Sequence, residues 1–282
     1  MSKKNKIIEP AYINSPLNNP MPNYHVYYMN STEKVLVSLI SFIIGGFVGY
    51  IFYGNLFMAD GEATTATYIS NAVVFIIVGI LASKFLIPIY VKNKLAKQQN
   101  KIKFQFCDML DSLTSSISSG SNVVKAFESA TNDLKMQYDE EDFIVREMDE
   151  IMNGISQNIG IEVMMRNFGE RSGNEDIVSF ADIFEICYRK GGDMQSVIYK
   201  THSVITDKIS ISDEIETKLT SNKLQHNVMS LMPIAVVAML RATNDSFAES
   251  FTTPVGIIVN TIAIGVFLGA YRYGLKIVDV KG

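Results

Sequence analysis

The sequence predicts an all-α integral membrane protein, with two transmembrane helices before and two after a cytoplasmic antiparallel bundle of about six helices. Three observations lead to this prediction. Charged residues make up only 19% of the 282 residues and hydrophobic residues 48%, whereas soluble domains usually hold about 25% charged residues. The apolar residues are concentrated in long stretches near both ends of the chain. Between these stretches, apolar residues recur every three or four positions, which is the period of an α-helix.

The chain begins with a tail, residues 1–34, which we expect to be irregular because it holds Pro10, Pro16, Pro20 and Pro22 and several asparagines. Residues 35–91 form the first predicted helix pair. The stretch 35–53 carries no charge, and the stretch 72–91 carries one, Lys84. Each is long enough, or nearly so, to cross a hydrocarbon core about 30 Å thick.

Residues 228–273 form the second predicted pair. The stretch 254–271 is uncharged, but the stretch 228–240 has only 13 residues, which reach roughly 20 Å as a helix. We expect this stretch to span by using residues 223–227 as an interfacial turn or by thinning the bilayer. A re-entrant or interfacial helix is the alternative.

Basic residues indicate the orientation of these helices. They occur before the first stretch, just after the second and after the fourth, whereas the two remaining loops are more acidic than basic. The positive-inside rule therefore predicts a multi-pass membrane protein, and the family resemblance given below implies the cytoplasmic (inner) membrane. Both termini, the tail 274–282 and the domain 92–227 would face the cytoplasm.

The domain 92–227 has a helical pattern throughout. Apolar stripes with helical spacing run through residues 106–117, 123–134, 144–155, 177–188 and 194–219. Gly120, Gly191 and Gly192 stand between stripes, so we expect them to set the turns of helical hairpins. The segments 106–134 and 180–206 share the order of helix, glycine, polar cap and helix, which suggests an internal repeat of pattern.

This domain is acidic, with 16 Lys and Arg against 22 Asp and Glu. One run consists of Asp139, Glu140, Glu141 and Asp142. It is either a solvated helix start, where the helix dipole favours carboxylates, or a docking patch for a basic partner.

Sequence signatures of catalysis are not found. The chain has no GxxxxGK[ST], GxGxxG, GxSxG or HExxH motif. We therefore expect no enzyme activity, no cofactor and no metal site, and the net charge of −4 gives no reason to expect a nucleic-acid partner. Cys107 and Cys187 lie on apolar stripes and are expected to be core thiols.

Two glycine pairs in the apolar stretches have the spacing that lets membrane helices approach closely. They are Gly45 with Gly49 and Gly265 with Gly269. Asn260 could add a hydrogen bond between helices. Lys84 either extends its stem toward the cytoplasmic face or marks a transport path.

Two segments carry a family resemblance: SSISSGSNVVKAFESA at 115–130, and the stretch 153–209, which includes FGERSGNEDIVSFADIFEICYRKGGDMQSVIYK. With the flanking apolar pairs, they resemble the type II secretion F-family of inner-membrane platform proteins over residues 103–273. The closest similarity is to the platform proteins of tight-adherence (Tad) pilus systems, either the TadB or the TadC kind. The resemblance implies a cytoplasmic helical bundle without active-site residues, and homo- or hetero-oligomers. It also implies as partners a secretion or pilus ATPase, prepilin or pilin, and a second F-family platform protein.

The sequence therefore favours a non-enzymatic platform or scaffold subunit in a lipid membrane. It would couple a secretion ATPase to pilin assembly or protein secretion. A small transporter or channel subunit is the alternative, suggested only by Lys84, Asn260 and Arg272. A membrane-bound sensor comes third, because the predicted outer loops are short.

Overall fold

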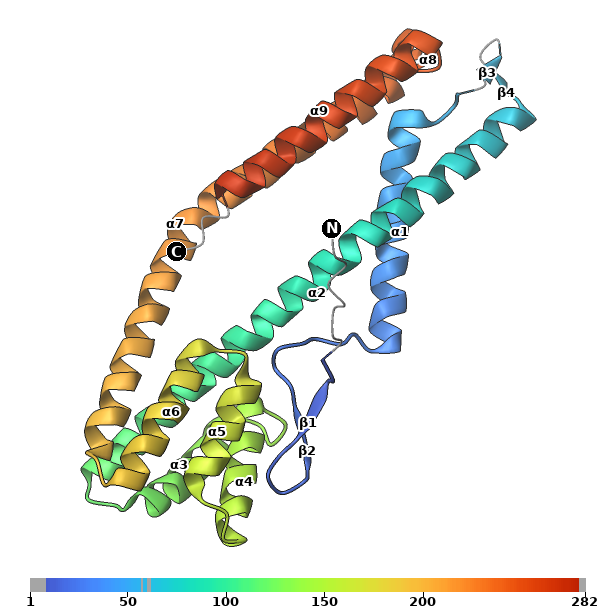
Figure 1. Cartoon of the computed structure of the whole chain (residues 1–282). Helices are drawn as coiled ribbons and strands as arrows, with labels where there is room; N and C mark the ends of the chain where they lie inside the picture. The colour runs from blue at the N-terminus through green and yellow to red at the C-terminus, as the bar shows by residue number, and fades with distance from the viewer. Residues whose placement is uncertain (1–8, 57, 60–61, 279–282) are drawn as a thin grey trace, which may run out of the picture. The chain divides into compact units, whose positions relative to one another are not determined.

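The computed structural model describes residues 9–56, 58–59 and 62–278, and it is 81% helical, which confirms the all-α class (Figure 1). The elements in chain order are β1 (Tyr12–Asn14), β2 (Pro20–Pro22), α1 (Ser31–Tyr53), β3 (Met58–Ala59), β4 (Glu62–Ala63), α2 (Thr65–Ser118), α3 (Val123–Gln137), α4 (Phe143–Ser156), α5 (Ile161–Ser172), α6 (Glu175–Lys190), α7 (Met194–Thr243), α8 (Asp245–Ser250) and α9 (Pro254–Val278).

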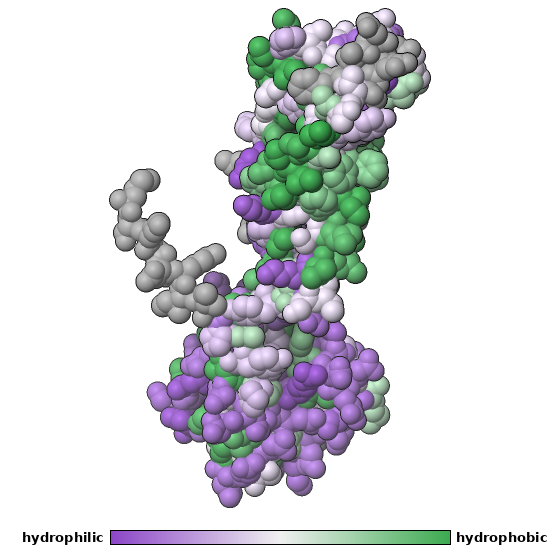
Figure 2. Space-filling model, turned by 90° about the vertical axis from the view of Figure 1, so that its right-hand side faces the viewer, coloured by the Kyte–Doolittle hydropathy of each residue, from purple (hydrophilic) through white to green (hydrophobic). Residues whose placement is uncertain are grey.

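The chain divides into two compact units. We call the first the core unit; it holds Val91–Ser210 and the residues up to Tyr28. The second, the span unit, holds Met29–Tyr90 and the residues from Ile211 onward. Helices α2 and α7 each contribute residues to both units. Figure 2 shows a mainly hydrophilic surface over one part of the molecule and large apolar areas over another.

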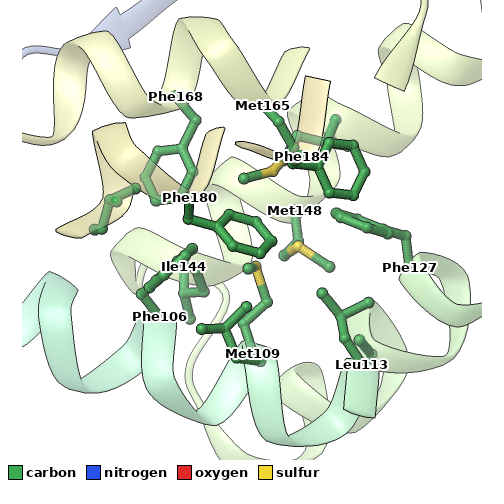
Figure 3. Close-up of a cluster of buried hydrophobic side chains, with 14 of the residues drawn as sticks. Phe106, Met109, Leu113, Phe127, Ile144, Met148, Met165, Phe168, Phe180 and Phe184 are labelled. Carbon is green, nitrogen blue, oxygen red and sulfur yellow. The ribbon is translucent and has the colours of Figure 1, made fainter. Parts of the chain in front are cut away.

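The core unit is organised around one cluster of buried apolar side chains. Fully buried members come from the end of α2, from each of α3 to α6 and from the start of α7. Figure 3 shows several of them pointing toward one another: Phe106, Met109, Leu113, Phe127, Ile144, Met148, Met165, Phe168, Phe180 and Phe184. Phenylalanine rings meet edge to face, as between Phe106 and Phe180, whose centroids lie 5.4 Å apart, a geometry that aromatic quadrupoles favour. The stripes predicted at 123–134, 144–155 and 177–188 therefore are the buried faces of α3, α4 and α6.

The N-terminal segment differs from the irregular tail that we expected. Strands β1 and β2 pair antiparallel as a hairpin, and the segment from Pro10 to Tyr24 packs against the core unit. Tyr24 is fully buried in the main cluster, and its backbone amide donates to the carbonyl of Arg171 at 2.9 Å. Proline is tolerated in β2 because the hairpin has only two strands, so one edge of each strand needs no donors.

Local sequence signals account for several helix ends. The side chain of Asn122 accepts from the amide of Lys125 at 2.9 Å and caps α3, as expected at this position. Asp193 does the same for the amide of Ser196 at 3.0 Å, at the start of α7. Gly191 ends α6 in the left-handed conformation, with φ of 75°, and Gly120 has φ of 91°. These are conformations that residues with a Cβ rarely adopt.

Three helices of the span unit are long and apolar enough to cross a membrane: Ser31–Tyr53, the apolar part of Thr65–Ser118, and Pro254–Gly274. These helices indicate a membrane protein. The short stretch 228–240 lies inside α7, which is not among the helices that meet this criterion in the described part of the chain. Of the predicted loops and tails, residues 1–8, 57, 60–61 and 279–282 lie outside the described residues.

Helices α1 and α2 pack closely within the span unit because glycines leave room. A Cβ on Gly45 would stand 2.2 Å from Cβ of Ala82, and one on Gly49 would stand 2.8 Å from Cβ of Val78. From α2, a Cβ on Gly79 would meet the ring of Phe42 at 2.6 Å. Each of these contacts is too short for any larger residue, so the glycines set the distance between the two helices.

We expect Gly191→Ala to destabilise the core unit by about 1–2 kcal/mol, because L residues pay that cost in the left-handed region. No other atom lies within 4 Å of where the Cβ would stand, so backbone strain is the whole effect. Gly191→Asn should cost less, since asparagine tolerates this conformation. Exposure of the buried Cys107 thiol to a thiol-reactive dye on heating, in a Cys187→Ser background, measures the shift. Equal melting of Gly191→Ala and the parent would contradict the expectation.

Candidate functional site

The predicted docking run forms the connection between α3 and α4. Asp139, Glu140 and Glu141 are exposed, whereas Asp142 is half-buried and is the N-cap residue of α4. The amide of Asp142 donates to the carbonyl of Asp139 at 2.9 Å, which closes the turn. Three of the four predicted carboxylates are therefore free to meet a partner.

The fourth carboxylate has a structural role. Asp142 forms an ion pair with Lys101 of α2, and the hydrogen bond from Lys101 holds the pKa of Asp142 below its usual value despite some burial. Lys101 also lies 5.5 Å from the centroid of the Phe143 ring. On the other side of the loop, the hydroxyl of Tyr138 donates to Asp108. Burial, with Asp108 beside it, raises the pKa of Tyr138. The acidic loop is thus fixed at both ends to α2.

Behind the loop, α4 and α5 share a buried ion pair. Glu147 and Arg171 form two parallel hydrogen bonds, from Nη1 to Oε1 at 2.8 Å and from Nη2 to Oε2 at 2.6 Å. Their side chains are only 1% and 2% exposed. Arg171 also donates from Nε to Asn167 at 2.8 Å and from Nη1 to the carbonyl of Pro22 at 3.0 Å. Tyr24 completes the cluster, with its hydroxyl donating to Oε1 of Glu147 at 2.9 Å.

The electrostatics of this pair follow from its burial. Burial disfavours the charged form of Arg171, but the hydrogen bonds and the negative charge of Glu147 outweigh it and raise the pKa of Arg171. Burial, then the Glu147 charge, raises the pKa of Tyr24 well above its ordinary value. Arg171 is therefore charged and Tyr24 is neutral at physiological pH. The hydrogen bonds of this cluster join α4, α5 and the N-terminal segment.

A second carboxylate of α4 holds the hairpin. Glu150 is buried, one turn after Glu147, and accepts from the hydroxyl of Ser15. The side-chain amide of Asn19 donates to both of its carboxylate oxygens, at 3.2 and 3.1 Å. Both ends of the N-terminal hairpin are consequently attached to successive turns of one helix.

These polar anchors were missed in the sequence. Glu147 has the same helical spacing as Ile144, Met148 and Ile151, so a charge on an apolar face was the available signal. The role of Arg171 was harder to predict because the apolar pattern did not mark α5 as a separate helix. Gly173, which the sequence indicates as a break before Asn174, ends α5 with φ of 65°. A Cβ there would stand 3.1 Å from the carbonyl oxygen of Tyr24, a contact that the sequence did not indicate.

The structure places the remaining predicted residues in different surroundings. Gly192 follows Gly191 without a left-handed φ, and a Cβ on it would lie 3.1 Å from Sγ of Cys187. Gly265 and Gly269 have no other atom within 4 Å of where a Cβ would stand. Asn260 is buried and donates to the carbonyl of Phe52 at 2.8 Å, which joins α9 to α1.

The three residues of the transporter alternative are not brought together by any contact in the described residues. Asn260 bonds to α1, Lys84 lines a groove between α1 and α2, and Arg272 is exposed on α9. Among the described residues, no group of three His, Cys, Asp or Glu side chains could hold a metal ion. Comparison with known proteins finds no family model, no curated protein and no solved structure that matches the chain.

Removing one partner of the Glu147–Arg171 pair should destabilise the core unit by about 3–5 kcal/mol, because the other charge is left buried and unpaired. Glu147→Gln leaves Arg171 unpaired, and Arg171→Met leaves Glu147 unpaired. Tyr24→Phe, which leaves the ion pair intact, should cost only about 1–2 kcal/mol. Denaturant melts of the full chain in detergent, followed by labelling of Cys107, measure the differences. Single changes that cost no more than Tyr24→Phe would show that the pair is not the main polar anchor.

Proposed function

We propose that this chain is a non-enzymatic platform subunit of a type II secretion or type IV/Tad pilus assembly machine. In this role it resembles the F-family proteins of the TadB or TadC kind. It couples a cytoplasmic secretion ATPase to pilin assembly or protein secretion. The observation that carries the proposal is α7, a helix of 50 residues that belongs to the core unit at its start and to the span unit from Ile211 onward.

A rigid core unit supports this role, because a displacement applied to a well-packed body passes to a helix anchored in it. Ile198 and Ile205 of α7 are buried in the main cluster. The exposed carboxylates at 139–141 are attached to the same body through Asp142 and Lys101. A basic surface of the ATPase would therefore dock on a loop that cannot move separately from the core.

The finer architecture belongs to the same proposal. Four spans would have the stretch 228–240 of α7 as the third, with Pro233 inside it. The core unit would be the cytoplasmic antiparallel bundle, built by α3 to α6 and the adjoining ends of α2 and α7. The span unit would contact the lipid of the inner membrane, prepilin or pilin, and a second F-family platform protein.

A small transporter or channel subunit is the competing function. Its support is an apolar cavity of about 740 Å³ within the span unit, which Asn260, Pro233 and Phe251 help to line. The cavity carries no charged side chain among its lining residues, whereas a path for ions or polar solutes needs polar groups. This observation favours the platform.

Purification of the tagged full chain from native membranes in mild detergent, followed by mass spectrometry, tests the proposal. We expect a secretion-type ATPase and a second F-family protein to co-purify. Asp139→Asn, Glu140→Gln and Glu141→Gln together should lower ATPase recovery several-fold, because exposed charges that face a complementary patch speed association. The matched control neutralises three exposed carboxylates elsewhere: Glu128→Gln, Asp133→Asn and Asp207→Asn.

The outcomes separate the two parts of the proposal. If neither protein co-purifies with the wild-type chain, the proposed platform function is refuted. Equal ATPase recovery with the loop variant and its control would refute docking at 139–141 while leaving the platform function supported.

Coupling through α7 is tested by softening the helix. Thr217→Gly and Thr220→Gly together cost about 2 kcal/mol of helix propensity relative to alanine. We expect this variant to co-purify with its partners but to lose pilus assembly or secretion. Thr217→Ala with Thr220→Ala is the control and should retain both. Normal assembly by the glycine variant would show that α7 does not transmit the movement.

A further inference from the structure

The first two helices of the span unit enclose a groove that mixes two chemistries. It has a volume of about 750 Å³. Apolar side chains, among them Leu39, Phe42 and Ile87, form one part of its lining. Lys34 of α1 and Lys84 of α2 form the other, together with three serine residues. A ligand that fits this lining has a negatively charged end and an apolar end.

The two ammonium groups have no counter-charge among the residues that the structure describes. Neither Lys34 nor Lys84 takes part in an ion pair among the described residues, and both are exposed. The nearest carboxylate along the chain, Glu33, accepts from the hydroxyl of Tyr90 at 2.7 Å instead. A lysine inside an apolar helix is costly unless it pairs with another group or extends to the interface, and an anion in the groove would be such a partner.

The serine side chains add neutral polarity and no negative charge. Ser83 donates to the carbonyl of Ser38 at 3.1 Å, which ties α2 to α1 beside Lys84. Ser31 is the first residue of α1, and the start of a helix of 23 residues carries a partial positive charge. The charged side chains that line the groove are both cations, so the lining favours an anion.

We propose that this groove is a binding site for an anionic phospholipid. The phosphate would lie between the ammonium groups of Lys34 and Lys84, and an acyl chain would lie along Leu39 and Phe42. A neighbouring apolar hollow on α1, which shares Val35 and Leu39 with the groove, extends this surface. Basic pockets between membrane helices are suited to acidic lipid headgroups. The inference depends on the apolar helices lying in a membrane and is independent of the platform function.

Native mass spectrometry of the full chain in detergent tests the site, with phosphatidylglycerol and phosphatidylethanolamine of identical acyl chains as probes. We expect tighter binding of phosphatidylglycerol. Lys34→Gln and Lys84→Gln should each weaken it about fivefold, the factor that corresponds to one lysine near an anionic headgroup. The double variant should lose the preference, whereas Lys84→Arg should keep it. Lys97→Gln, an exposed lysine of the core unit, is the matched control.

Two kinds of result would overturn the proposal. One is equal binding of the two lipids by the wild type, or equal effects of Lys84→Gln and Lys97→Gln. The other is displacement of phosphatidylglycerol by glycerol phosphate at equal concentration, which would make the site one for a soluble phosphate compound. Lys84→Arg keeps the test decisive if the double variant does not fold, because it preserves the charge and changes only the shape of the cation.

Discussion

The core unit depends on the buried ion pair of Glu147 and Arg171. Two charges removed from water cost several kcal/mol each unless every polar atom finds a partner. No single helix of this unit supplies all of them: α4 brings the carboxylate, α5 brings the guanidinium, and the N-terminal segment brings the Tyr24 hydroxyl and the Pro22 carbonyl. The pair is therefore satisfied only when three segments that are distant in the sequence come together. We infer that this requirement favours one packing of α4 on α5 over alternatives that apolar contacts alone would allow.

The same constraint gives the acidic loop its mechanical character. Phe143, the first residue of α4, packs edge to face on Tyr24 with ring centroids 5.2 Å apart. Lys101 lies 5.5 Å from the centroid of the Phe143 ring and pairs with Asp142. The exposed carboxylates at 139–141 thus stand directly before a helix that is held by the buried pair. A partner docked there would act on the whole core unit. This property supports the proposed role of a subunit that receives movement from a partner.

Helices of the core unit could be predicted from the sequence wherever an apolar stripe was long and bounded by a glycine or a cap, as at Asn122 for α3 and Gly191 for α6. Helix α5 was harder to predict because it has only 12 residues between two helix breaks. The N-terminal hairpin could not be predicted, since its position depends on Glu147 and Glu150, more than a hundred residues away. Composition alone could not distinguish Asp142 from the three exposed carboxylates of the acidic run, because its partner Lys101 is on another helix. Long-range polar contacts leave no periodic pattern in the sequence, so periodicity could not predict them.

The span unit shows that a polar or small residue in an apolar helix acquires its role from what faces it. Gly45 and Gly49 lie against Ala82 and Val78, whereas Gly265 and Gly269, with the same spacing, face open space. Asn260 has a backbone carbonyl as its partner inside the unit. Lys84 has no such partner, and a cation is far more expensive than an amide or a glycine to leave unmatched in a hydrocarbon environment. A second lysine in the same groove, Lys34, adds to the positive charge. The described residues supply no compensating carboxylate, and the headgroup of an anionic lipid, as in the proposed site, would supply the counter-charge from the membrane.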